Sequence, residues 1–369
     1  MKILHINSYY NGENFYKNLY NKQEEEGLKI EVYVPVTQNT DISNPAWGGY
    51  TKVSKNHSKY DRLFFHVKHK KIYNDIRKKY SLENFSLAHA HSLFSNGYIA
   101  MKLKAEYNLP YIVAVRNTDV NLFFKRMLHL RNLGVNILRE ASKIIFLSKS
   151  YRDLVIEKYV PENLKENFYK KSVVIPNGID DFWFTNIDEK KTNPISKNLK
   201  LLYVGDINKN KNIVTSIKSI EILEKNNFKV DFTIVGKIKD KDIYEIMKKN
   251  PSVHYIPRQP KDLLINIYRN NDIFIMPSIT ETFGLVYAEA LSQGLPVVYS
   301  RGQGFDRQFE EGQVGYHVHA TDSDDIAQKI LAITKEYILI SNRCIENSKV
   351  FEWGKITKKY NDIYNNVFN

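Results

Sequence analysis

The sequence predicts an α/β protein built from two Rossmann-like domains whose parallel sheets face a central cleft. Its 369 residues suit two domains of roughly 180 residues each. Short runs of Ile, Val, Leu and Tyr alternate with segments of helical periodicity, which is the pattern of βαβ units with a parallel sheet. Because this alternation occurs twice, with a polar stretch between the two series, each half of the chain is expected to form its own sheet.

In the first half of the chain, strands separated by helices are expected at residues 3–6, 30–34, 88–91, 111–115, 144–147 and 173–175. Each is a short apolar run that ends in polar or turn residues. Residues 37–60 contain Gly, Asn and Ser without clear periodicity, and they favour a mobile loop that could cover a site.

The second half repeats this pattern, with strands expected at residues 201–204, 232–235, 253–256, 273–276 and 297–299. Turn residues at 176–180, followed by a polar stretch as far as residue 198, mark the boundary between the two series. We therefore predict a first domain at residues 1–178, a second at 179–350, and a helix at 351–369 that packs back towards the first domain.

Composition limits where the protein acts and what it binds. The single cysteine, Cys344, excludes an intrachain disulfide and fits a reducing compartment. The first apolar run is too short for a signal peptide, and no stretch reaches the ~18 apolar residues of a membrane span, so a cytoplasmic protein is expected. Residues 1–180 hold 28 basic and 17 acidic residues, a net +11 out of the total +13.

Such a basic excess attracts lipid headgroups, a lipid-linked phosphate, an acidic glycan or nucleic acid, although lysines kept for solubility would look the same. Residues 122–131 predict a basic helix with apolar neighbours. That helix either docks on anionic lipid, which would place the protein peripherally at the inner face of the membrane, or packs its apolar residues into the core.

The most informative stretch, residues 273–298, reads strand, loop, helix, strand. A helix that starts near Phe283 or Gly284 aims the free backbone amides of its first turn into the crevice above the sheet, which makes an anion site. Gly284 also lets the backbone approach a ligand closely. Glu281 precedes this helix and Glu289 lies in its second turn, so both carboxylates can face one ligand.

In this context the sequence resembles the retaining family-4 glycosyltransferases of the GT-B fold. The likeness covers nearly the whole second half and, more thinly, the first half through residues 89–92 and 175–180. The resemblance implies that Glu281 contacts the donor sugar, that Glu289 contacts the ribose, and that the amides of residues 283–285 hold the diphosphate. The residues that carry it are Pro277, Ser278, Glu281, Phe283, Gly284, Leu285, Glu289, Gly294, Pro296, Val297 and Val298.

A second part of the resemblance lies at residues 203–212. Relatives carry Arg directly after the Gly that ends the strand, and Lys five residues later. Gly205 and Lys211 fit this pattern, whereas Asp206 stands at the Arg position. The resemblance therefore implies a diphosphate site that lacks one cation, for which either Lys209 or Arg258 compensates, unless the loop binds differently.

Two further departures from the family pattern lie in the first half. Arg116 replaces a His that relatives place near the transferred sugar. Its guanidinium is expected either to pair with the carboxylate of an acidic sugar or to form an ion pair with Asp119. Near the N-terminus, only Gly12 remains of a Gly-Gly loop that touches the diphosphate in relatives.

The resemblance implies a retaining hexosyltransferase that needs no metal and no cofactor. Its expected substrates are a nucleotide-sugar, with UDP as the first choice, and a glycan or lipid-linked acceptor in the synthesis of surface polysaccharide or another glycoconjugate. Transfer would be front-side, with the leaving phosphate accepting the acceptor proton and Lys211 stabilising its charge. Helix capping by Asp240 and Asp322 explains the two Asp-x-Asp sequences, and His89 and His91 show no metal-ligand spacing with a carboxylate.

Other functions remain to be weighed. A sugar-nucleotide epimerase of similar fold should lack the helix that carries Glu281 and Glu289. A non-catalytic nucleotide- or glycan-binding partner of a transferase would fit Asp206, Arg116 and the single Gly12. A basic nucleic-acid binder has no recognised motif to support it, so no nucleic-acid partner is expected.

Overall fold

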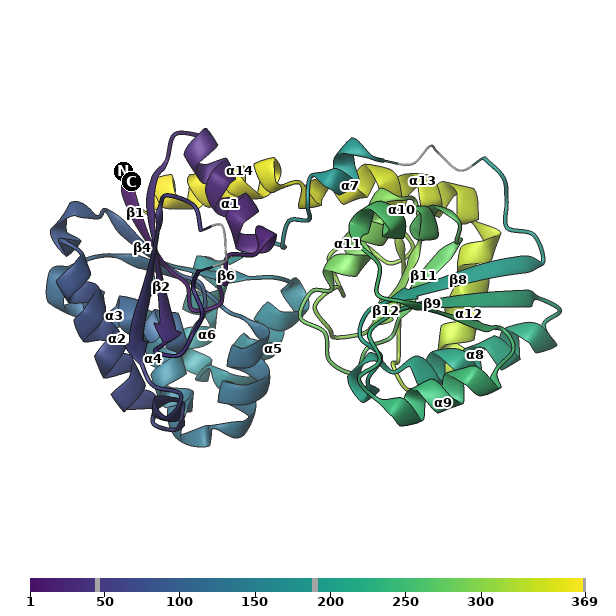
Figure 1. Ribbon diagram of the computed structural model, residues 1–369, viewed down its shortest axis with the longest axis horizontal. Helices are drawn as coiled ribbons and strands as arrows, with labels where there is room; N and C mark the ends of the chain where they lie inside the picture. The colour runs from purple at the N-terminus through teal and green to yellow at the C-terminus, as the bar shows by residue number, and fades with distance from the viewer. Residues whose placement is uncertain (44–46, 188–191, 368–369) are drawn as a thin grey trace. The chain divides into compact units, whose positions relative to one another are not determined.

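The computed structural model describes residues 1–43, 47–187 and 192–367 of the chain. They form two compact units, each with one parallel sheet and its own helices (Figure 1). Unit 1 contains Met1–Leu147, Arg152–Gly178 and Trp353–Asn369, and unit 2 contains Ser148–Tyr151 and Ile179–Glu352. The predicted fold class, two α/β domains with a parallel sheet in each, is confirmed.

The sheet of unit 1 contains every strand that was expected in the first half. The first five of those apolar runs are almost entirely buried, as in a sheet covered on both faces, whereas Val173 and Val174 in the last run are only partly buried. Its strand pairs are all parallel. In spatial order the strands are β3 (Thr51–His57), β2 (Lys29–Thr37), β1 (Lys2–Ile6), β4 (Leu87–Ala90), β5 (Tyr111–Ala114), β6 (Lys143–Phe146) and β7 (Ser172–Val174).

The prediction of a mobile loop at residues 37–60 is wrong for its second half, because β3 lies there. This strand pairs with β2 from Val32 opposite Thr51 to Thr37 opposite His57. It lies at the edge of the sheet, and only Ser54 and His57 in it are fully buried. An edge strand whose buried residues are polar carries no apolar alternation, so the sequence pattern could not show it. Residues 44–46 of the expected loop lie outside the described residues.

The final helix completes the core of unit 1. Trp353, Ile356 and Tyr364 from this helix pack in one buried cluster with residues of the sheet such as Ile3 and Val32. The helices of this unit are α1 (Asn14–Glu25), α2 (Phe65–Lys79), α3 (Ser95–Tyr107), α4 (Arg131–Glu140), most of α5 (Lys149–Tyr159), α6 (Glu162–Lys171) and α14 (Trp353–Asn366).

The predicted helix at residues 122–131 is only partly correct, because a helical segment over residues 117–126 ends at Met127 and a short turn follows before α4 begins at Arg131. The helical segment has π geometry at Asp119–Phe124, and a 3-10 turn covers Leu128–Leu130. Between them Met127 has φ −102° and ψ 72°, which is outside the helical region and ends the helical segment.

The sheet of unit 2 contains all five strands expected in the second half and one more, β13, which is short and half exposed. Its helices are α7 (Phe182–Thr185), α8 (Ile213–Lys225), α9 (Lys241–Lys249), α10 (Lys261–Arg269), α11 (Leu285–Ser292), α12 (Ser323–Lys335) and α13 (Tyr337–Ser348). In spatial order the strands are β10 (Val253–Pro257), β9 (Lys229–Gly236), β8 (Asn198–Val204), β11 (Ile273–Met276), β12 (Val297–Ser300) and β13 (Gly315–Val318).

This strand order places a switch point beside β8. Successive strands add on one side from β8 to β9 and β10, and the chain then returns to add β11, β12 and β13 on the other side. Ligands of open α/β sheets bind at such a point, beyond the carboxyl ends of the strands. The order therefore directs attention to the loops after β8, β9, β10 and β11.

Helix ends in unit 2 agree with the sequence prediction. The side chain of Asp240 accepts hydrogen bonds from the backbone amides of residues 242 and 243, and Asp322 does the same for residues 324 and 325. Both aspartates therefore act as caps, as predicted for the two Asp-x-Asp sequences. Among the described residues, no helix is long and apolar enough to cross a membrane.

Candidate active site

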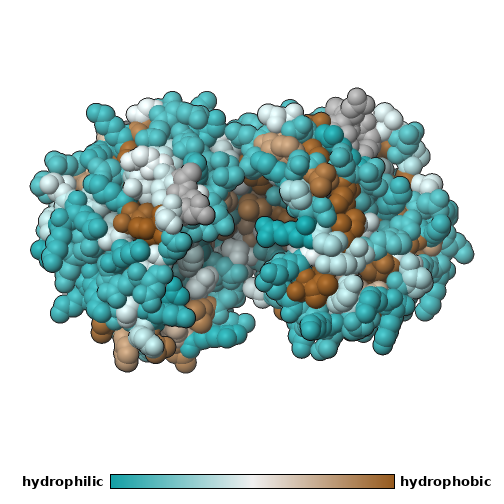
Figure 2. All heavy atoms as spheres, in the orientation of Figure 1, coloured by the Kyte–Doolittle hydropathy of each residue, from teal (hydrophilic) through white to brown (hydrophobic). Residues whose placement is uncertain are grey.

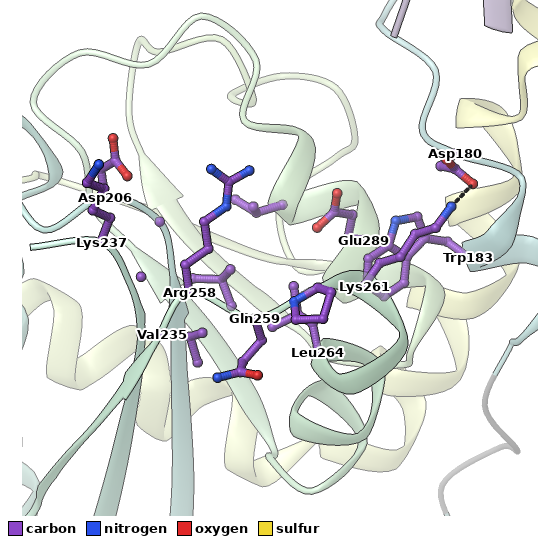
Figure 3. Close-up of a pocket in the computed structure, with 15 residues that line it drawn as sticks. Asp180, Trp183, Asp206, Val235, Lys237, Arg258, Gln259, Lys261, Leu264 and Glu289 are labelled. Carbon is purple, nitrogen blue, oxygen red and sulfur yellow. Dashed lines mark hydrogen bonds and ion pairs between the residues drawn. The ribbon is translucent and has the colours of Figure 1, made fainter. Parts of the chain in front are cut away.

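A cavity of about 810 Å³ lies in unit 2 at the carboxyl ends of three neighbouring strands (Figure 3). Gly205 and Asp206 follow β8, Lys237 follows β9, and Arg258 follows β10. Figure 3 shows Arg258 and Glu289 reaching from different elements into the same space. The cavity therefore lies where the strand order predicts a ligand.

Glycine at the end of β9 keeps this part of the cavity compact. A Cβ on Gly236 would lie 1.8 Å from the carbonyl oxygen of Gly205, so only glycine lets these two backbone segments approach so closely. Both glycines line the cavity. Its wall is consequently backbone rather than side chain at the point where β8 and β9 end.

Glu289 is the carboxylate that α11 turns towards the cavity. Its Oε2 accepts a hydrogen bond from the Tyr268 hydroxyl at 3.2 Å. Burial raises the pKa of Glu289 to about 7, because removing water penalises the charged form more than the tyrosine hydrogen bond favours it. Near neutral pH this side chain can therefore present either a carboxylate or a carboxylic acid to a ligand.

Basic side chains surround the remaining part of the cavity. Lys237, Arg258 and Lys261 line it. Lys261 Nζ forms an ion pair with Asp180 Oδ1 at 2.9 Å, which Figure 3 marks at the cavity edge. The cavity thus contains a carboxylate, Glu289, that can accept hydrogen bonds from the hydroxyl groups of a ligand, and basic side chains that can bind an anionic group.

Lys211 and Glu281 form a close ion pair in the same unit, with Nζ and Oε2 2.5 Å apart. Lys211 lies in a 3-10 turn after β8, and Glu281 lies in the loop between β11 and α11. The pair brings together two residues that the sequence analysis had assigned to one ligand. Neither residue is among those that line the 810 Å³ cavity, whereas Glu289, Gly205, Asp206 and Arg258 are.

A second loop holds Glu281 in place. The backbone amide of Glu281 donates to Gln303 Oε1 at 3.0 Å, and its carbonyl accepts from the Gly304 amide at 2.8 Å. A Cβ on Gly304 would lie 1.6 Å from the Thr282 carbonyl oxygen. Gly304 is therefore required for the two loops to cross, a role that its sequence context did not reveal.

Helix α11 begins where the sequence predicted an anion site. Its cap is Gly284, with φ 75°. A Cβ there would lie 2.6 Å from the Tyr287 ring, so glycine is favoured both by backbone conformation and by space. The side chain of Phe283 is buried against Phe305 and Phe351, which leaves only its backbone for a ligand. The first amides of α11, including that of Leu285, have no intrahelical acceptor.

Two predicted site residues belong to unit 1. Gly12 has φ 82°, a conformation that glycine adopts readily. The Arg116 guanidinium donates through Nε to the His91 carbonyl at 3.1 Å and through Nη1 to Asn177 Oδ1 at 3.4 Å. These contacts fix the direction of the Arg116 side chain, and an interaction with an acidic sugar stays a prediction.

Asp119, the alternative partner expected for Arg116, forms its hydrogen bonds with backbone amides. The buried Asp119 carboxylate accepts hydrogen bonds from the backbone amides of Leu93, Phe94 and Arg116 at 2.9, 3.1 and 2.8 Å. Burial raises the pKa of Asp119 to about 6. Asp119 therefore ties two loops together through backbone donors, and the nearby Arg116 guanidinium adds an electrostatic attraction.

His89 and His91 are core residues. They lie with His5 in a fully buried group whose ring nitrogens approach within 4.8 Å of one another. The rings of His89 and His91 stack with centroids 4.0 Å apart and planes 22° apart. His5 Nδ1 and His91 Nε2 share a hydrogen bond of 3.0 Å, and His89 Nδ1 bonds the Tyr364 hydroxyl.

Two family models match the chain. The model described as Glycosyltransferase Family 4 matches residues 12–181, and the model described as Glycosyl transferases group 1 matches residues 185–351. Together they cover nearly the whole of both units. The chain belongs to the family 4 glycosyltransferases. The family and the enzyme class expected from the sequence are confirmed.

Relatives of this glycosyltransferase share its sequence at low identity. An uncharacterized glycosyltransferase of Methanocaldococcus jannaschii is 24% identical over 288 residues, which cover 76% of each chain. A capsular polysaccharide biosynthesis glycosyltransferase of Staphylococcus aureus is 28% identical over 243 residues, which cover 60% of this chain and 62% of that protein.

Solved structures of similar fold extend over the whole glycosyltransferase chain. Sucrose-phosphate synthase from Thermosynechococcus elongatus matches with a TM-score of 0.77 at 16% identity, covering 100% of this chain and 99% of that one. Anabaena HepE in complex with UDP-glucose matches with a TM-score of 0.67 at 16% identity, covering 99% and 100%. These likenesses establish the GT-B fold for the glycosyltransferase.

Sequence reasoning missed several residues of the cavity in this glycosyltransferase. Lys237 and Lys261 line it from the end of β9 and the start of α10, and Trp183 lines it from α7. Lys237 could have been found, because it follows a glycine that directly ends a strand, the same signal that marked Gly205. Trp183 carries no such signal, since it reaches the cavity only through tertiary packing.

Proposed function

We propose that the protein transfers a sugar from a UDP-sugar to a glycan or lipid-linked acceptor in the synthesis of a surface polysaccharide or a related glycoconjugate. The observation that carries this proposal is the cavity at the carboxyl ends of β8, β9 and β10, which Val286 and Glu289 of α11 also line. The pair Lys211 and Glu281 lies in the same unit, on the loops that follow β8 and precede α11. Family 4 glycosyltransferases retain the anomeric configuration and need no metal. The charge on the leaving diphosphate must then be stabilised by protein groups alone.

The residues of unit 2 suit this task. As the bond between sugar and phosphate breaks, negative charge grows on the diphosphate, and donors fixed near that charge lower the barrier most. Lys211 and the amides of residues 283–285 are the donors that we assign. Glu289 would bind the ribose, and Glu281 would position the sugar through its hydroxyl groups rather than act as a nucleophile.

The proposed division of labour follows the two units. Residues 179–350 would bind the donor, with Gly205, Asp206 and Arg258 on the nucleotide. Residues 1–178 would bind the acceptor, with Gly12 and Arg116 contributing from this part of the chain. Support for UDP comes from the similar fold of Anabaena HepE, which was solved with UDP-glucose. Support for a polysaccharide product comes from the Staphylococcus aureus relative.

A thermal-shift screen tests the donor class. A ligand that binds only the folded protein raises the melting temperature by mass action. UDP and UDP-sugars should raise it more than GDP, ADP or UMP at the same concentration. A hydrolysis or transfer assay with the stabilising nucleotide-sugars then identifies the sugar. Stabilisation by none of these nucleotides would contradict the proposal.

Replacement of Lys211 tests the proposed stabiliser of the diphosphate. We expect Lys211→Ala to lower kcat by ~10² to 10³, because a preorganised donor of this kind is worth roughly 3 to 4 kcal/mol in the transition state. Lys225 is an exposed lysine in the last turn of α8, away from the proposed site, so Lys225→Ala is the matched control and should stay near wild type.

A double variant separates catalysis from the loss of the ion pair. Lys211→Ala leaves the Glu281 carboxylate without its cation, whereas Lys211→Met/Glu281→Gln removes both charges together. We expect the double variant to melt close to wild type and to remain slow. A Lys211→Ala protein that is folded and turns over at the wild-type rate would refute the assignment.

A further inference from the structure

Large apolar side chains gather on the surface of unit 1, and Figure 2 shows apolar groups along the lower edge of this unit. Tyr60, Leu63 and Phe64 are 81%, 80% and 64% exposed, although aromatic and aliphatic residues of this size are usually buried. A contiguous exposed apolar patch on a folded protein commonly marks a binding surface. We call the following set the apolar rim: Tyr60, Leu63, Phe64, Val67, Leu122 and Leu128.

Two segments supply the apolar rim, and they contact each other. The first is the 3-10 turn Tyr60–Leu63 with the start of α2, and the second is the stretch at residues 119–130. The rings of Phe65 and Phe123 meet edge to face with centroids 6.1 Å apart. The rim is therefore one surface built from two parts of the sequence.

The rim borders a cavity of about 690 Å³ in unit 1. Leu63 and Leu122 belong both to the rim and to the lining of this cavity. Further inside, Phe65, Phe123 and Met127 continue the apolar lining. A ligand in the cavity would consequently lie next to whatever covers the rim.

The charge around the rim is strongly positive. Residues 59–71 hold five basic residues and one acidic residue, and residues 121–131 hold three basic residues and no acidic one. The single acid, Asp61, is buried and pairs with Lys71 at 2.8 Å, so it does not oppose an anion at the surface. Arg62, Lys68 and His129 line the cavity itself, together with one acid, the exposed Asp41. Apolar side chains interspersed with cations are complementary to a membrane surface with anionic headgroups.

We propose that the apolar rim docks unit 1 on an anionic lipid bilayer, with its apolar side chains in the headgroup region and the surrounding cations on lipid phosphates. The docking itself does not depend on the proposed transfer reaction. Where that reaction uses a lipid-linked acceptor, docking also brings the 690 Å³ cavity to the bilayer surface, so that the acceptor headgroup can enter while its lipid stays in the membrane.

Vesicle flotation with the full chain tests this inference. The probes are phosphatidylcholine vesicles with and without about one third phosphatidylglycerol, at low and high salt. We expect wild type to float with the anionic vesicles at low salt and much less with neutral vesicles or at high salt, because salt screens the attraction to headgroups. Leu63→Ser/Phe64→Ser should weaken the binding at least tenfold, and Arg62→Gln/Lys70→Gln should weaken it severalfold.

Matched variants on other surfaces complete the experiment. Ile246 and Leu339 are exposed apolar residues on α9 and α13 of unit 2, so Ile246→Ser/Leu339→Ser should bind vesicles like wild type. The rim residues are exposed, and all variants should keep the wild-type melting temperature. Wild type that fails to float at low salt, or rim variants that float as well as wild type, would overturn the inference. Transfer to a soluble acceptor by a protein that does not float would overturn docking alone and leave the proposed function standing.

Discussion

Glu289 is a residue of the candidate site whose carboxyl group changes protonation near neutral pH. Its carboxyl group lines the 810 Å³ cavity, receives a hydrogen bond from Tyr268, and has a pKa raised to about 7 by burial. A carboxylate accepts two hydroxyl groups of a ribose, whereas the protonated form must donate one of its hydrogen bonds. Donor binding should therefore strengthen as the pH rises from 6 to 8.

The same pKa predicts how Glu289 affects stability. The pKa of Glu289 in the folded protein lies above its usual value of 4.5. Its contribution to the stability of the fold is therefore fully present below pH 4.5 and is lost as the pH rises towards 7. Glutamine cannot ionise, so Glu289→Gln should raise the melting temperature at pH 8 and change it little at pH 5. The same substitution should weaken UDP binding and remove the pH dependence of that binding. Melting curves and calorimetric titrations at both pH values measure this. An equal shift in melting temperature at pH 5 and pH 8 would count against it.

In unit 2, the loop and helix that carry the candidate site residues were predictable from the sequence, whereas the contacts of those residues were not. The motif around Glu281 and Glu289 located the loop and helix correctly, because glycine, proline and the apolar runs define those elements locally. The Lys211 and Glu281 ion pair joins residues 70 positions apart. Arg116 also donates to the His91 carbonyl, a contact that the sequence did not indicate because the position of a backbone acceptor is set by tertiary structure.

At the scale of elements, the crossing of two loops in unit 2 fixes Glu281. The amide of Gly304 bonds the Glu281 carbonyl, and an added Cβ would collide with the Thr282 backbone. Backbone atoms cannot move aside as the end of a flexible side chain can. The loop after β12 therefore acts as a support for the loop before α11.

Gly304→Ala should separate these loops. We expect it to destabilise unit 2 by about 1 to 3 kcal/mol, the usual cost of an overpacked site, and to lower turnover because Glu281 and Lys211 move. Gly354→Ala is the matched control, since nothing lies within 4 Å of its added Cβ. Urea unfolding together with steady-state kinetics gives both quantities. Wild-type kinetics in a Gly304→Ala protein would show that the crossing does not position the site.

Elements with a buried apolar face were predictable, and those without one were not. The core strands of both sheets agree with the apolar runs, because a parallel sheet covered on both faces selects Ile, Val and Leu. The sequence did not predict strand β3, because its buried residues, Ser54 and His57, are polar. It did not predict the structure at residues 119–130 correctly, because the apolar residues there divide between core and surface. Phe124 and Leu130 are buried, whereas Leu122 and Leu128 are exposed.

At the scale of the whole molecule, the two units should respond differently to acid. Unit 1 buries His5, His89 and His91 together, and burial lowers the pKa of all three, that of His5 to about 3. Such groups contribute stability above their unfolded pKa of about 6.5, and this contribution is lost as the pH falls below that value, by up to about 1.4 kcal/mol per group and pH unit. Asp119, whose pKa is raised to about 6, favours the folded state as the pH falls, and it offsets the stability lost at only one of the three histidines.

Hydrogen exchange measured at pH 7.5 and pH 5.5, and corrected for the intrinsic rate, checks this difference. Peptides from the sheet of unit 1 should lose more protection at the lower pH than peptides from the sheet of unit 2. His5→Leu removes one of the buried imidazoles and should reduce the loss in unit 1. An equal loss in both units, or the same loss with and without His5, would contradict the assignment.

The position of α14 also has a consequence for synthesis on the ribosome. The core of unit 1 needs Trp353, Ile356 and Tyr364, which are translated after all of unit 2. During translation, unit 2 can close its own core as soon as residue 352 emerges. The nascent first sheet, by contrast, waits with an uncovered face until α14 arrives, and during that interval it is the part of the chain that chaperones are expected to bind.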